Sequence, residues 1–154
     1  MLLLLTGPQG AGKTTLGALV ASRWERGVHV EGDVFRRFVV SGRAEMTEAA
    51  APEALAQLRL RYHLAVHTAQ AYARAGFNVV VEDVVAGPLL EELAPHFDRV
   101  VVLLPDEETV AARAGARHAS WLYRLFAQST PRVGIWLDSS RLTPDETAAA
   151  ILRG

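Results

Sequence analysis

The chain has 154 residues, of which 50% are hydrophobic, a formal net charge of −1 and no cysteine. This length and composition predict one ordered domain, residues 1–154, and the lack of cysteine excludes disulfides and thiolate metal sites. No run of basic residues is present, which argues against nucleic acid or a membrane as partner. The apolar N-terminal run is shorter than a signal peptide, so we expect a cytoplasmic protein.

The first apolar run and the loop after it form the strongest pattern. Residues 2–6 are typical of a strand buried on both faces of a parallel sheet. Residues 7–14 read GPQGAGKT, the spacing of a phosphate-binding loop, and Lys13 is the only lysine of the chain. Such a loop presents backbone amides and a lysine to nucleotide phosphates, and the Thr14 hydroxyl can ligate Mg²⁺. The expected phosphate-binding residues are Gly7, Gln9, Gly10, Ala11, Gly12, Lys13, Thr14 and Thr15.

A helix is predicted directly after this loop. Leu16, Leu19, Val20 and Trp24 recur at helical spacing. The helix therefore begins where the phosphates would bind, and its free amides and dipole favour an anion there.

The second predicted strand, Val28–Glu31, leads into Asp33 and Arg36. Ligands of open parallel sheets bind beyond the carboxyl ends of the strands. Asp33 is therefore a candidate to orient an acceptor hydroxyl and accept its proton, and Arg36 a candidate to bind an anionic group on the acceptor or the transferring phosphate. The alternatives are that Asp33 caps a helix and that Arg36 is a solvated surface cation.

A loop at Ser41–Ala51 precedes the longest predicted helix, Pro52–Ala75. His63 and His67 share one face of this helix, which we interpret as a solvated polar face, not a metal site. The buried face is predicted to consist of Leu55, Leu58, Tyr62, Ala65, Val66, Ala69 and Tyr72.

The third predicted strand, Asn78–Glu82, ends in the acidic pair Glu82-Asp83. An apolar strand with this ending has the form of a Walker B element, whose carboxylate holds Mg²⁺. Strand alternation directs the two side chains to opposite faces, so one of them is expected at the metal. We assign Asp83 to the metal, together with Thr14; the alternative is that Asp83 caps a turn.

The remaining elements complete an alternation of strands and helices. Strands are predicted at Arg99–Leu104 and Val133–Leu137, and helix starts at residues 87–88, 106–108 and 143–146. This alternation predicts an α/β fold, a five-stranded parallel sheet with helices on both faces.

Two arginines and three aromatic residues lie in the segment between the last two strands. Arg113 and Arg117 are four residues apart in a predicted helix, so they share a face from which they could close over the phosphates as catalytic residues. The alternative is pairing with nearby glutamates or solvent. We predict a short lid region at about residues 113–131. Trp121, Tyr123 and Phe126 are expected mainly in the core, with an apolar acceptor pocket as the alternative.

These segments resemble the nucleoside-kinase-like branch of P-loop phosphotransferases, and within it the chloramphenicol phosphotransferase-like proteins. The resemblance rests on the loop, residues 32–36 and 78–84, the two arginines, and residues 137–146. It implies a three-layer P-loop NTPase fold with sheet order 2-3-1-4-5, MgATP as donor and Asp33 as base. It further implies that Asp138–Arg141 lies by the adenine. Residues 32–42 are also similar to the acceptor segment of adenylate kinases, and gluconate kinases and zeta toxins share the layout.

The sequence therefore favours an ATP-dependent phosphotransferase that moves the γ-phosphoryl group to a hydroxyl of a small molecule. A kinase of nucleotide monophosphates and an ATP-binding switch that hydrolyses ATP slowly remain as alternatives. The expected cofactors are ATP and Mg²⁺, and the expected partners are a nucleotide and a small acceptor.

Overall fold

A five-stranded parallel sheet forms the centre of the molecule, and the computed structural model describes all residues from 1 to 154. The strands are β1 (Leu2–Thr6), β2 (Gly27–Glu31), β3 (Asn78–Glu82), β4 (Arg99–Leu103) and β5 (Ile135–Leu137). Their order across the sheet is β2-β3-β1-β4-β5, and every neighbouring pair is parallel. The predicted fold class and strand order are confirmed.

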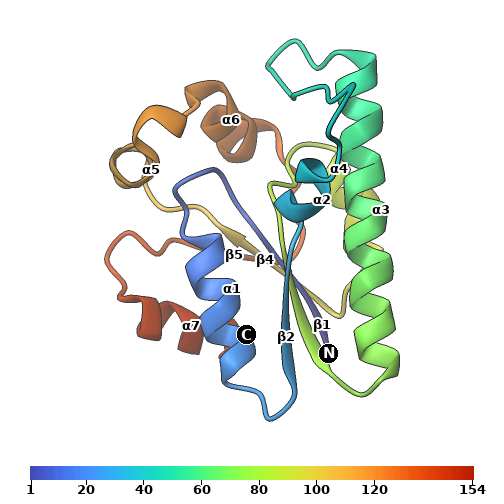
Figure 1. Cartoon of the computed structure of the whole chain (residues 1–154). Helices are drawn as coiled ribbons and strands as arrows, with labels where there is room; N and C mark the ends of the chain where they lie inside the picture. Colours follow the sequence, from blue (N-terminus) through green and yellow to red (C-terminus); the bar gives the residue numbers. More distant parts are fainter.

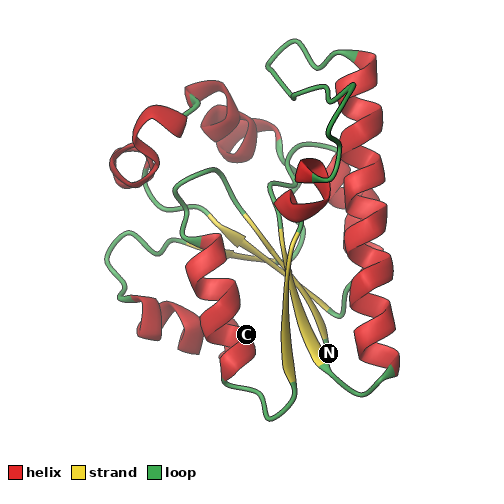
Figure 2. Cartoon of the chain, in the orientation of Figure 1, coloured by secondary structure: helices red, strands yellow, loops and turns green.

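Helices cover both faces of this sheet, so the molecule has three layers (Figures 1 and 2). Helices α1 (Lys13–Ser22) and α7 (Pro144–Arg153) pack on one face, and α3 (Pro52–Arg74) and α4 (Leu89–Leu93) pack on the other. The strand β1 serves both cores because its side chains alternate. Leu3 and Leu5 pack with α1, whereas Leu4 packs with α3, and none of the three is exposed.

The shorter helices lie over the carboxyl ends of the strands. They are α2 (Asp33–Arg37), α5 (Glu107–Ala114) and α6 (Ser120–Arg124), and they occupy the upper part of Figure 1 together with the phosphate-binding loop. Residues 39–51, which connect α2 to α3, contain no helix or strand, as predicted. Because sheet ligands bind at this edge, these segments enclose the candidate site.

Three local predictions were wrong. The last strand begins at Ile135 and not at Val133, because Gly134 adopts a positive φ of 74° and interrupts the extended chain. Helix α5 ends at Ala114, where Gly115 has a φ of 56°, so Arg113 and Arg117 do not share a helical face. Tyr72 was predicted on the buried face of α3 but is 44% exposed.

The helix starts predicted at residues 106–108 and 143–146 are confirmed. Asp106 accepts a hydrogen bond from the backbone amide of Thr109 at the start of α5, and Thr143 and Glu146 form a reciprocal capping box at the start of α7. No helix of the structure is both long and apolar enough to cross a membrane.

Candidate active site

The phosphate-binding loop connects β1 to α1 and offers free backbone donors. Gly10 and Gly12 have φ values of 89° and 92°, which only glycine adopts readily, and Gly12 directly precedes the helix. The amides of Gly12, Lys13 and Thr14 donate no backbone hydrogen bond. At a helix N-terminus such unpaired donors, together with the helix dipole, bind anions, so the loop fits nucleotide phosphates.

The other loop residues are placed by packing. Gly7 and Gly10 pass so close to the carbonyls of Leu103 and Val110 that a Cβ at either position would overlap them. Ala11 belongs to the core on the α1 face, whereas Gln9, Thr14 and Thr15 are exposed. Packing thus fixes one side of the loop against the rest of the protein, and the other side is exposed to solvent.

Lys13 is almost completely buried within the loop, at 8% exposure. Its Nζ donates a hydrogen bond to the carbonyl of Pro8 at 3.0 Å. Burial lowers the pKa of Lys13 to about 8; nearby Glu82 opposes this shift, and the positive charges of Arg61 and Arg117 add to it. A phosphate placed beside Lys13 would supply the negative charge that stabilises its ammonium form.

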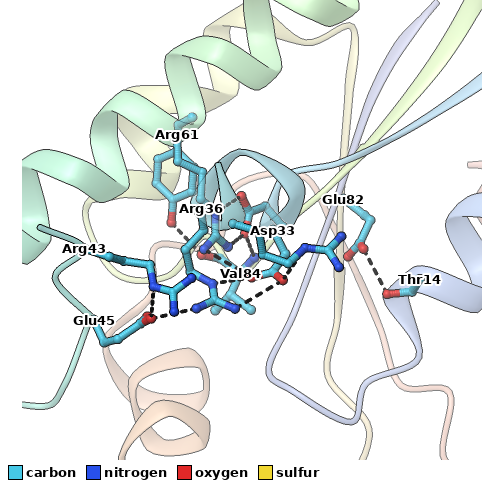
Figure 3. Close-up of polar contacts among 11 residues, drawn as sticks. Thr14, Asp33, Arg36, Arg43, Glu45, Arg61, Glu82 and Val84 are labelled. Atoms are coloured by element: carbon cyan, nitrogen blue, oxygen red, sulfur yellow. Dashed lines mark hydrogen bonds and ion pairs between the residues drawn. The ribbon is translucent and has the colours of Figure 1, made fainter. Parts of the chain in front are cut away.

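Glu82 lies beside the predicted magnesium-binding hydroxyl. The Thr14 hydroxyl donates to Oε1 of Glu82 at 2.9 Å, and Glu82 is buried (Figure 3). Oxygen donors of this kind suit Mg²⁺, which takes few protein ligands and completes its shell with phosphate oxygens and water. The structure has no cluster of three or more histidine, cysteine or acidic side chains that could hold a metal. The Thr14–Glu82 pair is thus the group of residues that fits Mg²⁺.

Asp83, which was assigned to the metal from the sequence, faces the other way. Arg61 binds both of its carboxylate oxygens, with 2.7 Å between Nε and Oδ2, and the Val84 amide donates to Oδ1 at 2.7 Å. The side chain of Asp83 is 2% exposed. Glu82 and Asp83 therefore point to opposite faces, as the alternation predicted, but Glu82 is the acid that contacts Thr14.

Asp33 opens α2 at the carboxyl end of β2 and is half-exposed. Its carboxylate accepts a hydrogen bond from Nε of Arg36 at 2.7 Å and lies 3.8 Å from Nη1 of Arg61. The hydrogen bond from Arg36 is the main cause that lowers the pKa of Asp33. Asp33 makes no side-chain capping bond, because Gly32 is the residue that precedes the helix. Its carboxylate is therefore ionised and available to a ligand.

Arg36 joins Asp33 to the segment before α3. Its Nη1 donates to Oε1 of Glu45 at 2.7 Å, and Arg43 also pairs with Glu45 at 3.0 Å (Figure 3). Arg36 thus has a carboxylate on each side, contrary to the alternative of a solvated surface cation.

Arg61 was not predicted as a site residue. It lies on α3 next to the buried Tyr62, and its side chain is 14% exposed. It pairs with Asp83, approaches Asp33, and its charge also acts on Lys13. No sequence motif marks it. The available signal was its position beside the buried face of a long helix, where a charged residue needs a partner.

A cavity of about 600 Å³ opens beside Asp33. Gln9 of the phosphate-binding loop also lines it, so donor loop and cavity adjoin. Both predicted catalytic arginines are exposed. Arg117 lines the cavity and acts on Lys13, whereas Arg113 does not line it and acts on Asp106. The remaining lining comes mainly from apolar side chains of α2, α3, α6 and the segments beside them.

The aromatic residues of the predicted lid divide between core and cavity. Phe126 is fully buried in the core on the α3 face, and Trp121 lines the cavity. The hydroxyl of Tyr123 donates to the carbonyl of Pro105 at 2.9 Å. Core packing is thus confirmed for Phe126, while Trp121 follows the alternative of an apolar pocket.

Comparison with known proteins agrees with this geometry. A family model described as AAA domain matches residues 2–124. The chain belongs to this AAA-domain family. No curated protein matches the chain significantly.

Solved structures similar to this AAA-domain protein include several kinases. A sugar kinase from Janibacter sp. HTCC2649 has a TM-score of 0.68 at 18% identity, covering 99% of this chain and 94% of that one. A shikimate kinase from Acinetobacter baumannii, in complex with shikimate, has a TM-score of 0.64 at 18% identity, covering 99% and 90%. The tunicamycin resistance protein of Deinococcus radiodurans has a TM-score of 0.69 at 14% identity, covering 99% and 93%. At these identities the likeness establishes the fold, which is that of P-loop kinases.

Proposed function

We propose that this protein is a small-molecule kinase, which transfers the γ-phosphoryl group of ATP to a hydroxyl. The observation that carries the proposal is that Gln9 of the phosphate-binding loop and Asp33 line the same cavity. A nucleotide switch needs the loop alone, whereas a kinase needs a second binding site beside the loop with a group that can hold the acceptor. The kinases among the structures of the same fold support this choice.

The donor side is proposed to consist of the loop amides, Lys13, Thr14 and Glu82. The amides and Lys13 would bind the β- and γ-phosphates, and Thr14 with Glu82 would hold Mg²⁺, in contrast to the earlier assignment of Asp83. When bound, the metal offsets phosphate charge. Asp83 is instead proposed to position Arg61, because its carboxylate is fully engaged by that guanidinium.

Asp33 is proposed to orient the acceptor hydroxyl and accept its proton. Its lowered pKa makes it a weak base, but phosphoryl transfer passes through a loose transition state in which little proton removal is needed before the bond forms. Orientation is therefore its larger contribution. Arg117, which lines the cavity and whose charge reaches Lys13, is proposed to stabilise the phosphate charge during transfer.

A nucleotide monophosphate is less well supported as acceptor. Its phosphate would need cations that are free to bind it, but Arg36 is paired with Asp33 and Glu45, and Arg61 is paired with Asp83. A kinase of nucleotides would have to break these pairs.

The test is a transfer screen with labelled ATP and Mg²⁺ over neutral alcohols, sugars, nucleosides and nucleotide monophosphates. We expect label in at least one hydroxyl compound, with loss of transfer in Lys13→Ala and Asp33→Asn. ATP binding without transfer to any compound would contradict the proposal and favour a switch. Label found in a nucleotide monophosphate alone would favour the nucleotide kinase.

A further inference from the structure

The wall of the acceptor cavity is mostly apolar. Seventeen of its 24 lining residues are hydrophobic. They come from four separate parts of the chain, around α2, along α3, after β3 and around α6, so the cavity is enclosed by the tertiary fold and not by one local motif. A hydroxyl group placed against such a wall would lose its hydrogen bonds to water without replacement. A polyhydroxylated acceptor therefore fits this wall poorly.

Apart from Arg117, every charged side chain of the lining is in an ion pair. Arg36 lies between Asp33 and Glu45, and Arg61 is held by the buried Asp83. These pairs occupy two of the three lining cations, Arg36 and Arg61.

Arg117 is the lining cation that makes no ion pair in the structure. Its charge acts on Lys13, so it lies near the phosphate-binding loop. An acceptor carboxylate or phosphate would thus enter a region where each positive charge is either paired or assigned to the donor.

The rim of the cavity carries exposed apolar side chains. Phe38 is 68% exposed and Leu60 54%, although both line the cavity. Phe38 stands edge-on to Phe35 with 5.9 Å between ring centroids, which leaves part of its ring open. Apolar surface of this kind is stabilised when a ligand with an apolar body removes it from water.

We infer that the acceptor is an uncharged molecule with a large apolar body and a hydroxyl that reaches Asp33. A cavity of about 600 Å³ is of the size that holds drug-sized ligands. In the reaction the acceptor oxygen forms a bond to the γ-phosphorus, and the bond from that phosphorus to the β,γ-bridging oxygen breaks. ADP leaves with the electron pair of that bond, and the hydroxyl proton passes to Asp33. This inference rests on the proposed function.

The inference can be tested by titration calorimetry with three probes, in the presence of ADP and Mg²⁺. Biphenylmethanol is neutral with one hydroxyl, the same molecule with a carboxylate on its distal ring is its charged counterpart, and gluconate is an anionic polyol. We expect biphenylmethanol to bind at least about tenfold more tightly than either anion. Equal or tighter binding of the carboxylate or of gluconate would overturn the inference.

A matched pair of variants ties this binding to the cavity. Phe38→Ala shortens an exposed side chain that lines the cavity, so we expect biphenylmethanol to bind about threefold to tenfold more weakly with the thermal midpoint unchanged. Val40→Ala is the control, because Val40 is 96% exposed on the same segment and does not line the cavity. Equal effects of the two variants would contradict the assignment of the cavity.

Transfer of label from ATP, measured on the same probes, separates the inference from the proposed function. Preferential binding of biphenylmethanol without transfer to any hydroxyl compound would overturn the proposed kinase activity and support the ligand class. Transfer to gluconate but not to biphenylmethanol would support the kinase and overturn the inference.

Discussion

The donor loop and the acceptor cavity lie at the same edge of the sheet but are built in opposite ways. The donor loop is one continuous segment, residues 7–15, and it offers backbone amides, the buried ammonium of Lys13 and the hydroxyl of Thr14. The cavity gathers apolar side chains from distant segments, and its charged side chains other than Arg117 are in ion pairs. Backbone groups can bind the phosphates that all nucleotides share. Side chains from separate elements can instead be specific for one acceptor compound.

The largest expected effect concerns the donor side. Lys13→Ala removes the only lysine of the chain, whose ammonium lies within the phosphate-binding loop. We expect the rate of phosphoryl transfer to fall by about a thousandfold or more, because electrostatic stabilisation of the transferring group is lost. The measurement is label transfer under single-turnover conditions, with circular dichroism to verify folding. A rate within tenfold of the wild-type protein would show that Lys13 does not act on the transferring phosphate.

The next effect concerns the acceptor side. Asp33→Asn keeps the size of the side chain but removes its charge, and we expect transfer to fall about a hundredfold, because the acceptor hydroxyl loses the carboxylate that orients it and accepts its proton. Affinity for ADP should stay unchanged, because the site of Asp33 is the cavity and not the loop. Asp145→Asn, which alters an exposed carboxylate paired with Arg23 far along the chain, is the control. Full activity of Asp33→Asn would refute its role as base and orienting group.

The third prediction concerns the ion pair between Arg61 and Asp83, because Arg61 also approaches Asp33 and its charge acts on Lys13. Arg61→Met leaves the buried Asp83 without its partner, and we expect a loss of about 3 kcal/mol in the free energy of unfolding. The double variant Arg61→Met/Asp83→Leu should lose less, because no unpaired charge then remains buried. Urea unfolding of both proteins measures the difference. A double variant less stable than the single one would mean that Asp83 stabilises the fold even without Arg61, which would contradict the expected cost of an unpaired buried charge.

The smallest effect is a pH dependence confined to the donor side. Since the pKa of Lys13 is lowered to about 8, its protonated fraction in the free protein falls as pH rises through that value. ADP binding favours the protonated form, so affinity should decline about tenfold from pH 7 to about pH 9. In Lys13→Arg, whose guanidinium stays protonated in this range, the affinity should not depend on pH. Binding of biphenylmethanol to the wild-type protein should likewise stay constant, since Lys13 does not line the cavity.

Much of the donor side could be predicted because its chemistry is local. The spacing of residues 7–14, the apolar run before it and the helical pattern after it are contiguous, and backbone geometry alone converts them into a phosphate site. The strands and the capping box at Thr143 depend on equally short patterns. The strand order came from the family resemblance, and the structure has the same order.

The acceptor side could be predicted only in part. Asp33 was predicted because strand ends mark the ligand edge, and an apolar pocket was predicted only as the alternative for the aromatic residues 121, 123 and 126. Arg61 was not predicted, since its partners are distant in sequence. Alternation showed that Glu82 and Asp83 face opposite ways, yet the face that holds the Thr14 hydroxyl depends on how α1 packs on β3. Gly115 ended the helix that was expected to join Arg113 and Arg117.

The sequence by itself determined that this protein folds around a parallel sheet and has a nucleotide-phosphate loop, because both follow from the order of neighbouring residues. Only the tertiary structure decided which acid lies beside Thr14, which arginines act on Lys13, and that the cavity beside Asp33 is mostly apolar with Arg36 and Arg61 in ion pairs. These features depend on side chains that meet across the sheet and its helices. Their pairing is set by packing and by the cost of burying charge, which no short segment specifies.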